Sequence, residues 1–210
     1  MRAFLGLALG LFAVLMVGDW VRAEAPAVTQ KAVPVLRDSK QKPDPLYFTD
    51  HQEFMAMQEA YGSFPEGLVA SSTKEPQGSN RYGAERMGDF NTKTAWVEGH
   101  SDYGLGESVS FMWREKNHFH TCAALSLMNG YQKSKGLMES NSRVKDIDLY
   151  ADGELKARLA LQDRLGYQTF GLDGLGLRDG QRIKLVIRDV YKGTKWKDTC
   201  ISELIVQCVP

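Results

Sequence analysis

The sequence predicts an all-β protein, an antiparallel sandwich or barrel, and three observations lead to that class. From position 67 onward, short runs of residues alternate apolar and polar side chains or are continuously apolar, as strands do. Turn signals such as Asp152-Gly153 separate the runs, and no helical pattern alternates with them. Closely spaced strands without intervening helices are typical of sheets that pack face to face or close into a barrel.

The expected strands follow one another through a single domain, residues 65–210. Two further turns are indicated at Asp173-Gly174 and Asp179-Gly180. With 43% hydrophobic residues, the chain can bury one good core. The predicted strands cover residues 67–72, 107–113, 121–129, 144–151, 155–161, 167–172, 181–190 and 201–209.

Residues 1–23 are typical of a secretory signal peptide. Arg2 supplies the positive charge, residues 3–18 are apolar, and Val21-Arg22-Ala23 fits the cleavage rule for small residues. An uncleaved anchor is the alternative, but the apolar run falls short of the ~20 residues that a membrane span needs. We expect cleavage after Ala23, with Ala25 as a second site, and export to the periplasm or the exterior. No other apolar stretch would then hold the protein in a membrane.

Two segments precede the domain. Residues 24–45 contain four prolines without periodicity, which predicts a disordered linker. Residues 46–64 predict a short helix, because Thr49 can cap it and Phe54, Met57 and Tyr61 recur at helical spacing. We expect this apolar stripe to pack on the domain.

Three cysteines cannot all pair within one chain. Export permits disulfides, but Cys200 and Cys208 would lie roughly 26 Å apart on one strand at ~3.3 Å per residue. Cys122 therefore pairs with one of them, or all three are reduced. His118, His120 and Cys122 would share one face of a strand and could bind zinc, although no fourth ligand is placed by spacing.

The charge balance argues against a polyanionic partner. Lysine plus arginine equals aspartate plus glutamate, at 26 each. Removing Arg2, Asp19 and Arg22 with the signal peptide leaves a net charge of −1. Bulk electrostatics thus gives no support for nucleic acid or an anionic membrane as the partner.

Four loops should lie at one end of the sandwich if successive strands alternate in direction. They are residues 99–107, 130–143, 162–166 and 191–199. Their mixture of aromatic rings and fixed polar groups suits a sugar, whose C–H faces stack on rings while its hydroxyls need polar partners. The side chains gathered there would be His100, Asp102, Tyr103, Glu107, Tyr131, Gln132, Lys133, Asn141, Arg143, Tyr191, Lys192, Lys195, Trp196 and Asp198.

At these residues the sequence resembles a known family, the discoidin-like translocation or glycan-binding domain of bacterial NAD glycohydrolase toxins. That domain is related to the type C domains of coagulation factors V and VIII. The likeness is carried by Ala70-Ser71-Ser72, Tyr82, Ala84, Gly88-Asp89, Thr94-Ala95-Trp96-Val97-Glu98-Gly99, Gly104, Gly106-Glu107, Asn129-Gly130-Tyr131, Lys133, Asn141-Ser142-Arg143-Val144-Lys145, Gln168-Thr169-Phe170, Val190-Tyr191-Lys192-Gly193-Thr194, Asp198-Thr199 and Ile201-Ser202-Glu203.

The resemblance implies a galactose-binding-like, discoidin-like jelly-roll β-sandwich that binds glycans or a cell-surface partner. It does not imply NAD as a ligand, because the catalytic domain of the toxins is a separate unit. Related sugar-binding modules often hold a structural Ca²⁺, and here the oxygen ligands would come from Asp89, Asn91, Thr94 and Glu203. The alternative is a turn satisfied by its own hydrogen bonds, with Glu203 paired to a lysine or arginine.

We therefore expect an exported, non-catalytic glycan-binding module. The motifs Gly-x-Ser-x-Gly, Gly-x-x-x-x-Gly-Lys-Ser and His-Glu-x-x-His are absent. The runner-up is a protein-interaction, toxin-translocation or adhesion module that uses the same loops on an envelope or toxin protein, and an enzyme is the third and least favoured class. The residues expected to bind the ligand are Tyr131, Lys133, Asn141, Arg143, Tyr191, Lys192, Trp196 and Asp198.

A second interpretation assigns some of these residues to the fold. Tyr131 and Tyr191 could tie loops to the backbone through their hydroxyls, and Arg143 could be buried against Asp198 or Glu203. By contrast, a local cluster of lysines, formed by Lys133, Lys135, Lys192, Lys195 and Lys197, favours contact with acidic sugars or anionic lipid headgroups.

Overall fold

A computed structural model describes residues 34–37, 62–63, 65–114, 116–117 and 120–209. Strands dominate these residues, with one short α-helix and one turn of 3-10 helix. In chain order the elements are β1 (Val35–Arg37), β2 (Gly62–Ser63), β3 (Glu66–Ala70), η1 (Ala84–Met87), β4 (Trp96–Val97), β5 (Ser108–Met112), β6 (Lys116–Asn117), β7 (His120–Asn129), α2 (Lys135–Ser140), β8 (Ser142–Ala151), β9 (Glu154–Ala160), β10 (Tyr167–Gly171), β11 (Arg182–Tyr191) and β12 (Thr199–Val209).

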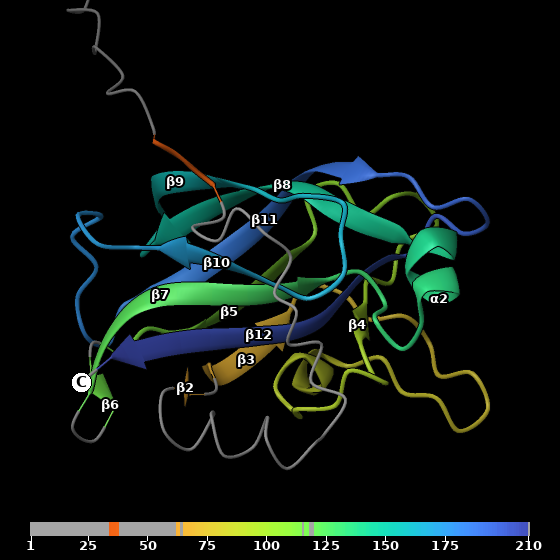
Figure 1. The fold of residues 1–210 in the computed structure, drawn as a ribbon, viewed down its shortest axis with the longest axis horizontal. Coiled ribbons are helices and arrows are strands. Elements are labelled where there is room, and N and C mark those ends of the chain that lie inside the picture. The colour runs from red at the N-terminus through yellow and green to blue at the C-terminus, as the bar shows by residue number, and fades with distance from the viewer. Residues whose placement is uncertain (1–33, 38–61, 64, 115, 118–119, 210) are drawn as a thin grey trace, which may run out of the picture. The chain divides into compact units, whose positions relative to one another are not determined.

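The long strands form two antiparallel layers (Figure 1). One layer has the order β10, β7, β12, and the other has the order β9, β8, β11, β5, β3. The layers join at one corner, where Thr199 and Cys200 of β12 pair in parallel with Ser142 and Arg143 of β8. The predicted all-β, discoidin-like sandwich is therefore confirmed.

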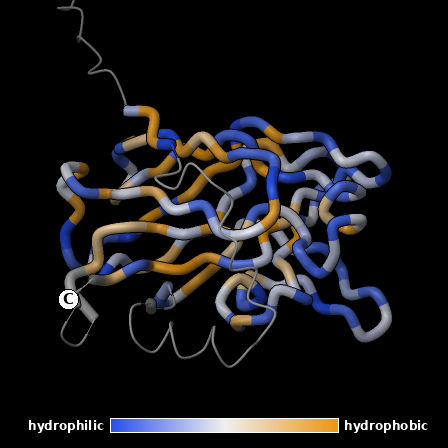
Figure 2. The backbone as a smooth tube through the Cα atoms, viewed as in Figure 1, coloured by the Kyte–Doolittle hydropathy of each residue, from blue (hydrophilic) through white to orange (hydrophobic). Residues whose placement is uncertain are grey.

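The core lies between the layers, because the inward side chains of each strand are apolar. Leu125 and Leu127 of β7 belong to the same buried cluster as Ile147 and Leu149 of β8. Figure 2 shows hydrophobic residues along the central strands and hydrophilic ones in the connecting loops. The alternation along each strand thus sets which face is buried.

All eight predicted strands are present, with ends shifted by three residues or fewer. The Asp-Gly turn between β8 and β9 is also as expected, since Asp152 and Gly153 both have positive φ, at 47° and 85°. Within the predicted linker, Val35–Arg37 is instead a strand that pairs in parallel with Arg158, Leu159 and Ala160 of β9. For these residues the disordered interpretation is wrong.

Other parts of the sequence interpretation fall outside the described residues. These are the signal peptide, the predicted linker apart from residues 34–37, and most of the predicted helix, whose last residues include strand β2. Within the part of the chain that the structure describes, no helix has the length and apolar character needed to cross a bilayer.

The cysteine prediction is confirmed in one of its forms. Cys122 of β7 is bonded to Cys208 of β12, and Cys200 is a buried free thiol. A sulfur engaged in a disulfide cannot act as a zinc ligand, so the zinc interpretation with Cys122 is wrong.

Candidate functional site

The four loops predicted to share one end of the sandwich do so. Arg143 Nη2 lies 2.5 Å from Asp163 Oδ2, and the Gly166 N–H donates to Gln132 Oε1 at 2.9 Å. The Thr199 hydroxyl donates to the carbonyl of Tyr103 at 2.8 Å, which links the 99–107 loop to the start of β12. The alternation of strand direction is therefore confirmed by contacts between loops distant in sequence.

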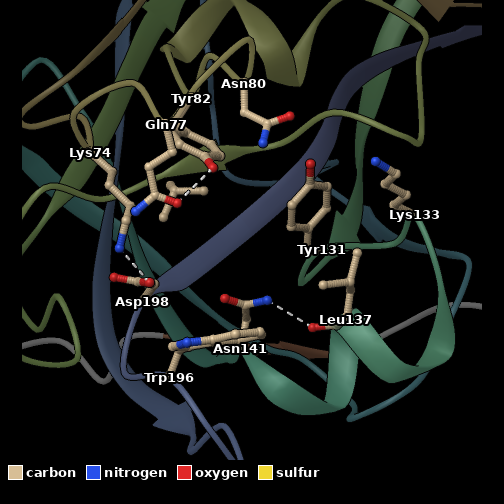
Figure 3. A pocket seen from close by; sticks show the side chains of 11 residues that line it. Lys74, Gln77, Asn80, Tyr82, Tyr131, Lys133, Leu137, Asn141, Trp196 and Asp198 are labelled. Atoms are coloured by element: carbon tan, nitrogen blue, oxygen red, sulfur yellow. Dashed lines mark hydrogen bonds and ion pairs between the residues drawn. The ribbon is translucent and has the colours of Figure 1, made fainter.

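Beside these loops lies an open cup of about 400 Å³ (Figure 3). Its volume falls within the range of small-ligand sites. The lining combines three aromatic rings, two of them tyrosines with hydroxyl groups, with amides and a few charged groups. The lining residues are Lys74, Gln77, Asn80, Tyr82, Val97, Tyr131, Lys133, Leu137, Asn141, Trp196 and Asp198.

One wall of the cup carries an ion pair. Lys74 Nζ lies 2.6 Å from Asp198 Oδ2, and both side chains are partly exposed. Beneath this wall the buried carboxylate of Glu98 accepts the N–H groups of His100 and Thr199, at 2.7 and 3.2 Å. Burial raises the pKa of Glu98. Glu98 thus fixes the backbone next to Asp198 without reaching the cup.

The floor of the cup is formed by aromatic and small apolar residues. Tyr82, Val97 and the free Cys200 are buried together, and Tyr131 packs against them. The hydroxyl of Tyr82 donates to Gln77 Oε1 at 3.2 Å. Burial raises the pKa of the Tyr131 hydroxyl, which donates to the carbonyl of Lys93 at 3.2 Å. The rings are therefore held in place from both ends.

Trp196 closes another side of the cup and is 38% exposed. The backbone N–H of Trp196 donates to the carbonyl of Ser140 at 2.8 Å, where helix α2 ends. The bend that brings it there requires Gly193, because a Cβ at that position would lie 2.3 Å from the Trp196 carbonyl oxygen. Asn141, the C-cap of α2, donates to the Leu137 carbonyl at 2.9 Å and faces the same cavity.

Five of the eight residues predicted to bind a ligand line the cup. They are Tyr131, Lys133, Asn141, Trp196 and Asp198. The other three, Arg143, Tyr191 and Lys192, lie at the same end of the domain but outside the lining.

Arg143 and Tyr191 serve the fold, as the second interpretation expected. Arg143 is 6% exposed and binds both carboxylate oxygens of Asp163 and the carbonyl of Asn141. Its acidic partner is therefore Asp163, and the expected pairing with Asp198 or Glu203 is wrong. The Tyr191 hydroxyl donates to the carbonyl of Leu161 at 3.0 Å. The amine of Lys192 lies 5.1 Å from the ring centroid of Tyr103.

Sequence reasoning missed the wall formed by residues 74–82. Lys74, Gln77, Asn80 and Tyr82 come from the connection between β3 and η1, which reaches the cup because the Lys74 N–H donates to the Val97 carbonyl at 2.9 Å. Residues 74–82 belong to the long connection between the strands predicted at 67–72 and 107–113, and alternating strand direction placed only the end of that connection, residues 99–107, at the loop end. Tyr82 was the one signal available, since it is among the residues that carry the family resemblance.

Three of the four residues proposed as calcium ligands, Asp89, Asn91 and Thr94, belong to the 88–94 loop. Glu203 of β12 lies beside this loop. Asp89 accepts the Asn91 N–H and the Thr94 hydroxyl, and Asn91 Oδ1 accepts the Lys93 N–H. Glu203 Oε1 accepts the Asn91 N–H at 2.7 Å. The loop therefore satisfies most of its own oxygens, as an Asx-rich turn does.

Glu203 Oε2 is the exception. It is buried and has no hydrogen-bond partner among the described residues. Burial and the charge of Asp89 raise the pKa of Glu203 to about 8. Glu203 Oε2 and the Asp89 carboxylate are oxygen donors of the kind that a hard cation binds, and Arg86 Nη1 already lies 3.3 Å from Asp89 Oδ2. No group of three or more His, Cys, Asp or Glu side chains in the described part of the chain forms a metal cluster.

Comparisons with known proteins bear on the fold and the family. No curated protein matches the sequence. One similar solved structure is the family 32 carbohydrate-binding module from Streptococcus pneumoniae EndoD, 18% identical over 67% of this chain and 95% of that chain, with a TM-score of 0.47. Another is a mutant of the arabinofuranosyltransferase AftD from Mycobacteria, 17% identical over 70% of this chain, with a TM-score of 0.45. This chain spans 12% of that transferase.

Both TM-scores lie below 0.5, so the assignment rests on the sequence match. Residues 60–207, well over half of the chain, match the family described as the NAD glycohydrolase translocation F5/8 type C domain. The matched segment coincides with the sandwich and includes every residue that lines the cup. The chain therefore belongs to the NAD glycohydrolase translocation F5/8 type C domain family.

Proposed function

We propose that the protein is an exported, non-catalytic module that binds a glycan in the cup at the loop end of the sandwich. The observation that carries this proposal is the composition of the lining. Aromatic rings at Tyr82, Tyr131 and Trp196 stand beside the amides of Gln77, Asn80 and Asn141. A sugar offers flat C–H faces to rings and hydroxyls to amides and carboxylates, so one ligand class uses both kinds of group.

The cup also has the rigidity that favours binding. The Tyr131 hydroxyl and the Asn141 side-chain amide each donate a hydrogen bond to a carbonyl group, and the backbone N–H of Trp196 donates to the Ser140 carbonyl, which fixes the backbone that carries the indole. A wall that is already ordered loses little conformational entropy when the ligand arrives. The two-layer sandwich beneath it keeps the loops at fixed separations.

The charged groups favour binding over catalysis. Glycoside hydrolysis needs two carboxyl groups on opposite sides of the scissile bond. Asp198 is the one carboxylate among the described lining residues, and it is paired with Lys74. We assign Asp198 to the recognition of hydroxyl groups.

Export and calcium are part of the proposal. The disulfide between Cys122 and Cys208 favours an oxidising compartment, which agrees with the signal peptide expected at residues 1–23. Calcium would have a structural role, binding Glu203 and Asp89 and holding the 88–94 loop.

A glycan array probed with the purified protein tests the proposal, followed by titration calorimetry on the glycans retained. We expect Trp196→Ala to weaken binding about tenfold, the equivalent of ~1.4 kcal/mol. The control is Leu105→Ala, because Leu105 is 57% exposed at the same end but does not line the cup. A folded protein that binds no glycan, or equal losses in the two variants, would contradict the proposal.

The family description supports a second candidate, a module that docks on a protein during translocation. The same cup and loops would then contact an envelope protein or a separately encoded toxin. Competition separates the two functions: simple sugars at millimolar concentration displace a glycan from the cup and leave a protein partner bound. A pull-down from envelope extract with and without sugar is the corresponding measurement.

A further inference from the structure

We infer that the glycan bound in the cup carries an anionic group, a carboxylate or a sulfate, and that Lys133 binds this group. The inference rests on the proposed function and adds the chemical class of the ligand. It follows from the distribution of charge around the cup, which differs from the balanced charge of the whole chain.

Within the lining, the positive charge of Lys133 is not compensated. The lining contains two lysines and one aspartate, and Lys74 already lies 2.6 Å from Asp198. Among the described residues, no carboxylate forms an ion pair with Lys133, which is exposed. Figure 3 shows Lys133 beside Tyr131, on the side of the cup away from the Lys74–Asp198 pair. A ligand stacked on Tyr131 would thus present its substituents to a free amine.

Three further lysines at this end of the domain add positive charge. The amine of Lys195 lies 4.4 Å from the ring centroid of Trp196, and those of Lys192 and Lys197 lie 5.1 and 5.8 Å from that of Tyr103. In the described part of the chain these three amines contact aromatic rings and form no ion pair. An aromatic ring holds a cation in position without cancelling its charge.

Most acidic residues at this end of the domain already form ion pairs or hydrogen bonds with other residues. Asp163 binds Arg143, and Glu139 lies 3.8 Å from Lys135. Glu107 accepts hydrogen bonds from Ser71 and Ser72 and lies 3.1 Å from His100 Nε2. Asp102, which is exposed and accepts a hydrogen bond from the Gly104 N–H, and Glu75, which is exposed next to Lys74, are acidic groups at this end that form no ion pair with the described residues. Lys133, Lys192, Lys195 and Lys197 outnumber these two carboxylates, so a ligand within about 10 Å experiences a net positive charge.

The size of the cup limits the class of ligand. A cavity of about 400 Å³ holds a compact molecule rather than a polyanion. A lysine amine is a single compact charge with three donors, which suits a carboxylate or sulfate on a ring otherwise bound by stacking and amides. An acidic sugar at the end of a glycan meets these conditions.

The test uses the full protein on an array that contains uronic, sialylated, sulfated and neutral glycans. We expect the acidic glycans to be retained, with affinity that falls as salt rises. The variant is Lys133→Gln, and the matched control is Lys135→Gln, because Lys135 is exposed, belongs to α2 and does not line the cup. Lys133→Gln should weaken binding to the acidic glycan at least fivefold, and Lys135→Gln less than twofold.

Comparison of the carboxylated with the sulfated glycans on the array identifies which anion is bound. Galacturonic acid carries a carboxylate where galactose carries a CH2OH group, and the two sugars are otherwise identical. The ratio of their affinities therefore measures the contribution of the carboxylate to binding. Retention of neutral glycans only would overturn this inference and leave the proposed function standing. Equal effects of the two lysine variants would overturn the role of Lys133. Failure to bind any glycan would overturn both the proposed function and the inference.

Discussion

Glu203 is a carboxyl group that β12 carries into the protein interior beside the 88–94 loop. Its side chain is fully buried, and burial together with Asp89 raises its pKa from 4.5 to about 8. Between these two pH values the folded protein keeps a proton that the unfolded chain has released. The free energy of unfolding contributed by this group is therefore greatest below pH 4.5 and falls as the pH rises towards about 8.

We expect Glu203→Gln to remove this part of the pH dependence, because an amide does not titrate. Urea unfolding without calcium should show a smaller loss of stability from about pH 5 to about pH 8 in the variant than in the original protein. Glu98, whose pKa burial also raises, is present in both proteins and cancels in the comparison. Millimolar calcium at the higher pH should stabilise the original protein alone, and equal gains would argue against calcium at Glu203.

Arg143 is a polar residue at the loop end that connects loops around the cup without lining it. Its guanidinium binds both oxygens of Asp163, and the Asp163 side chain is 38% exposed. We expect Arg143→Lys to lower the free energy of unfolding by ~1–3 kcal/mol, since one amine cannot reproduce the two-pronged contact. Chemical denaturation measures this loss. Glycan affinity below the unfolding transition should stay within twofold, and weaker binding at unchanged stability would place Arg143 in the ligand site instead.

Strands β7 and β12 connect the two ends of the domain. Each has the cup at one terminus, where Asn129 leads into Tyr131 and Thr199 follows Asp198. At the opposite termini, Cys122 and Cys208 join the same two strands by the disulfide. The covalent link and the binding site are thus separated by the length of both strands.

This separation predicts that stability and binding respond differently to loss of the disulfide. Replacing Cys122 and Cys208 together by serine should lower the free energy of unfolding by ~2–4 kcal/mol, because the bond closes a long loop in the unfolded chain. Glycan affinity measured well below the unfolding transition should change less than twofold. A parallel loss of affinity in the folded variant would mean that the cup depends on the disulfide.

The elements that the sequence predicted well are those whose pattern is local. Residues 182–188 of β11 alternate in burial, and residues 147–151 of β8 alternate apolar and polar side chains, so local sequence sets the faces of these strands. Helix α2 has only six residues, which is too short for a helical period to be visible in the sequence. It also contains Gly136, a poor helix former. Strands β1 and β4 exist because they pair with distant β9 and β12, and such pairing leaves no local mark in a three-residue or two-residue segment.

The same distinction explains how much of the site was predicted at the level of the whole molecule. Alternating strand direction was enough to bring Tyr131, Asn141 and Trp196 to one end. It could not show that the connection from β3 folds back over Val97 and supplies Lys74 to the cup, because that path depends on contacts across the finished fold. It also could not tell a buried arginine such as Arg143 from an exposed one.

The side chain of Tyr131 connects the cup to the proposed calcium loop. Tyr131 lines the cup with its ring, and its hydroxyl donates to the carbonyl of Lys93, a residue of the 88–94 loop. Calcium that orders this loop would hold the Lys93 carbonyl in place and thereby fix the ring on which the sugar stacks. Binding at one site should therefore favour binding at the other, to the same degree in both directions.

We expect calcium to strengthen glycan binding about two- to fivefold, the range that one hydrogen bond of ~0.5–1 kcal/mol can transmit. Tyr131→Phe keeps the ring and removes the hydroxyl, so the variant should bind both ligands while the affinity for glycan no longer depends on calcium. Calorimetric titrations of glycan with calcium and with chelator, for both proteins, measure the coupling. If calcium strengthens glycan binding equally in the Tyr131→Phe variant, the coupling does not pass through the Tyr131 hydroxyl.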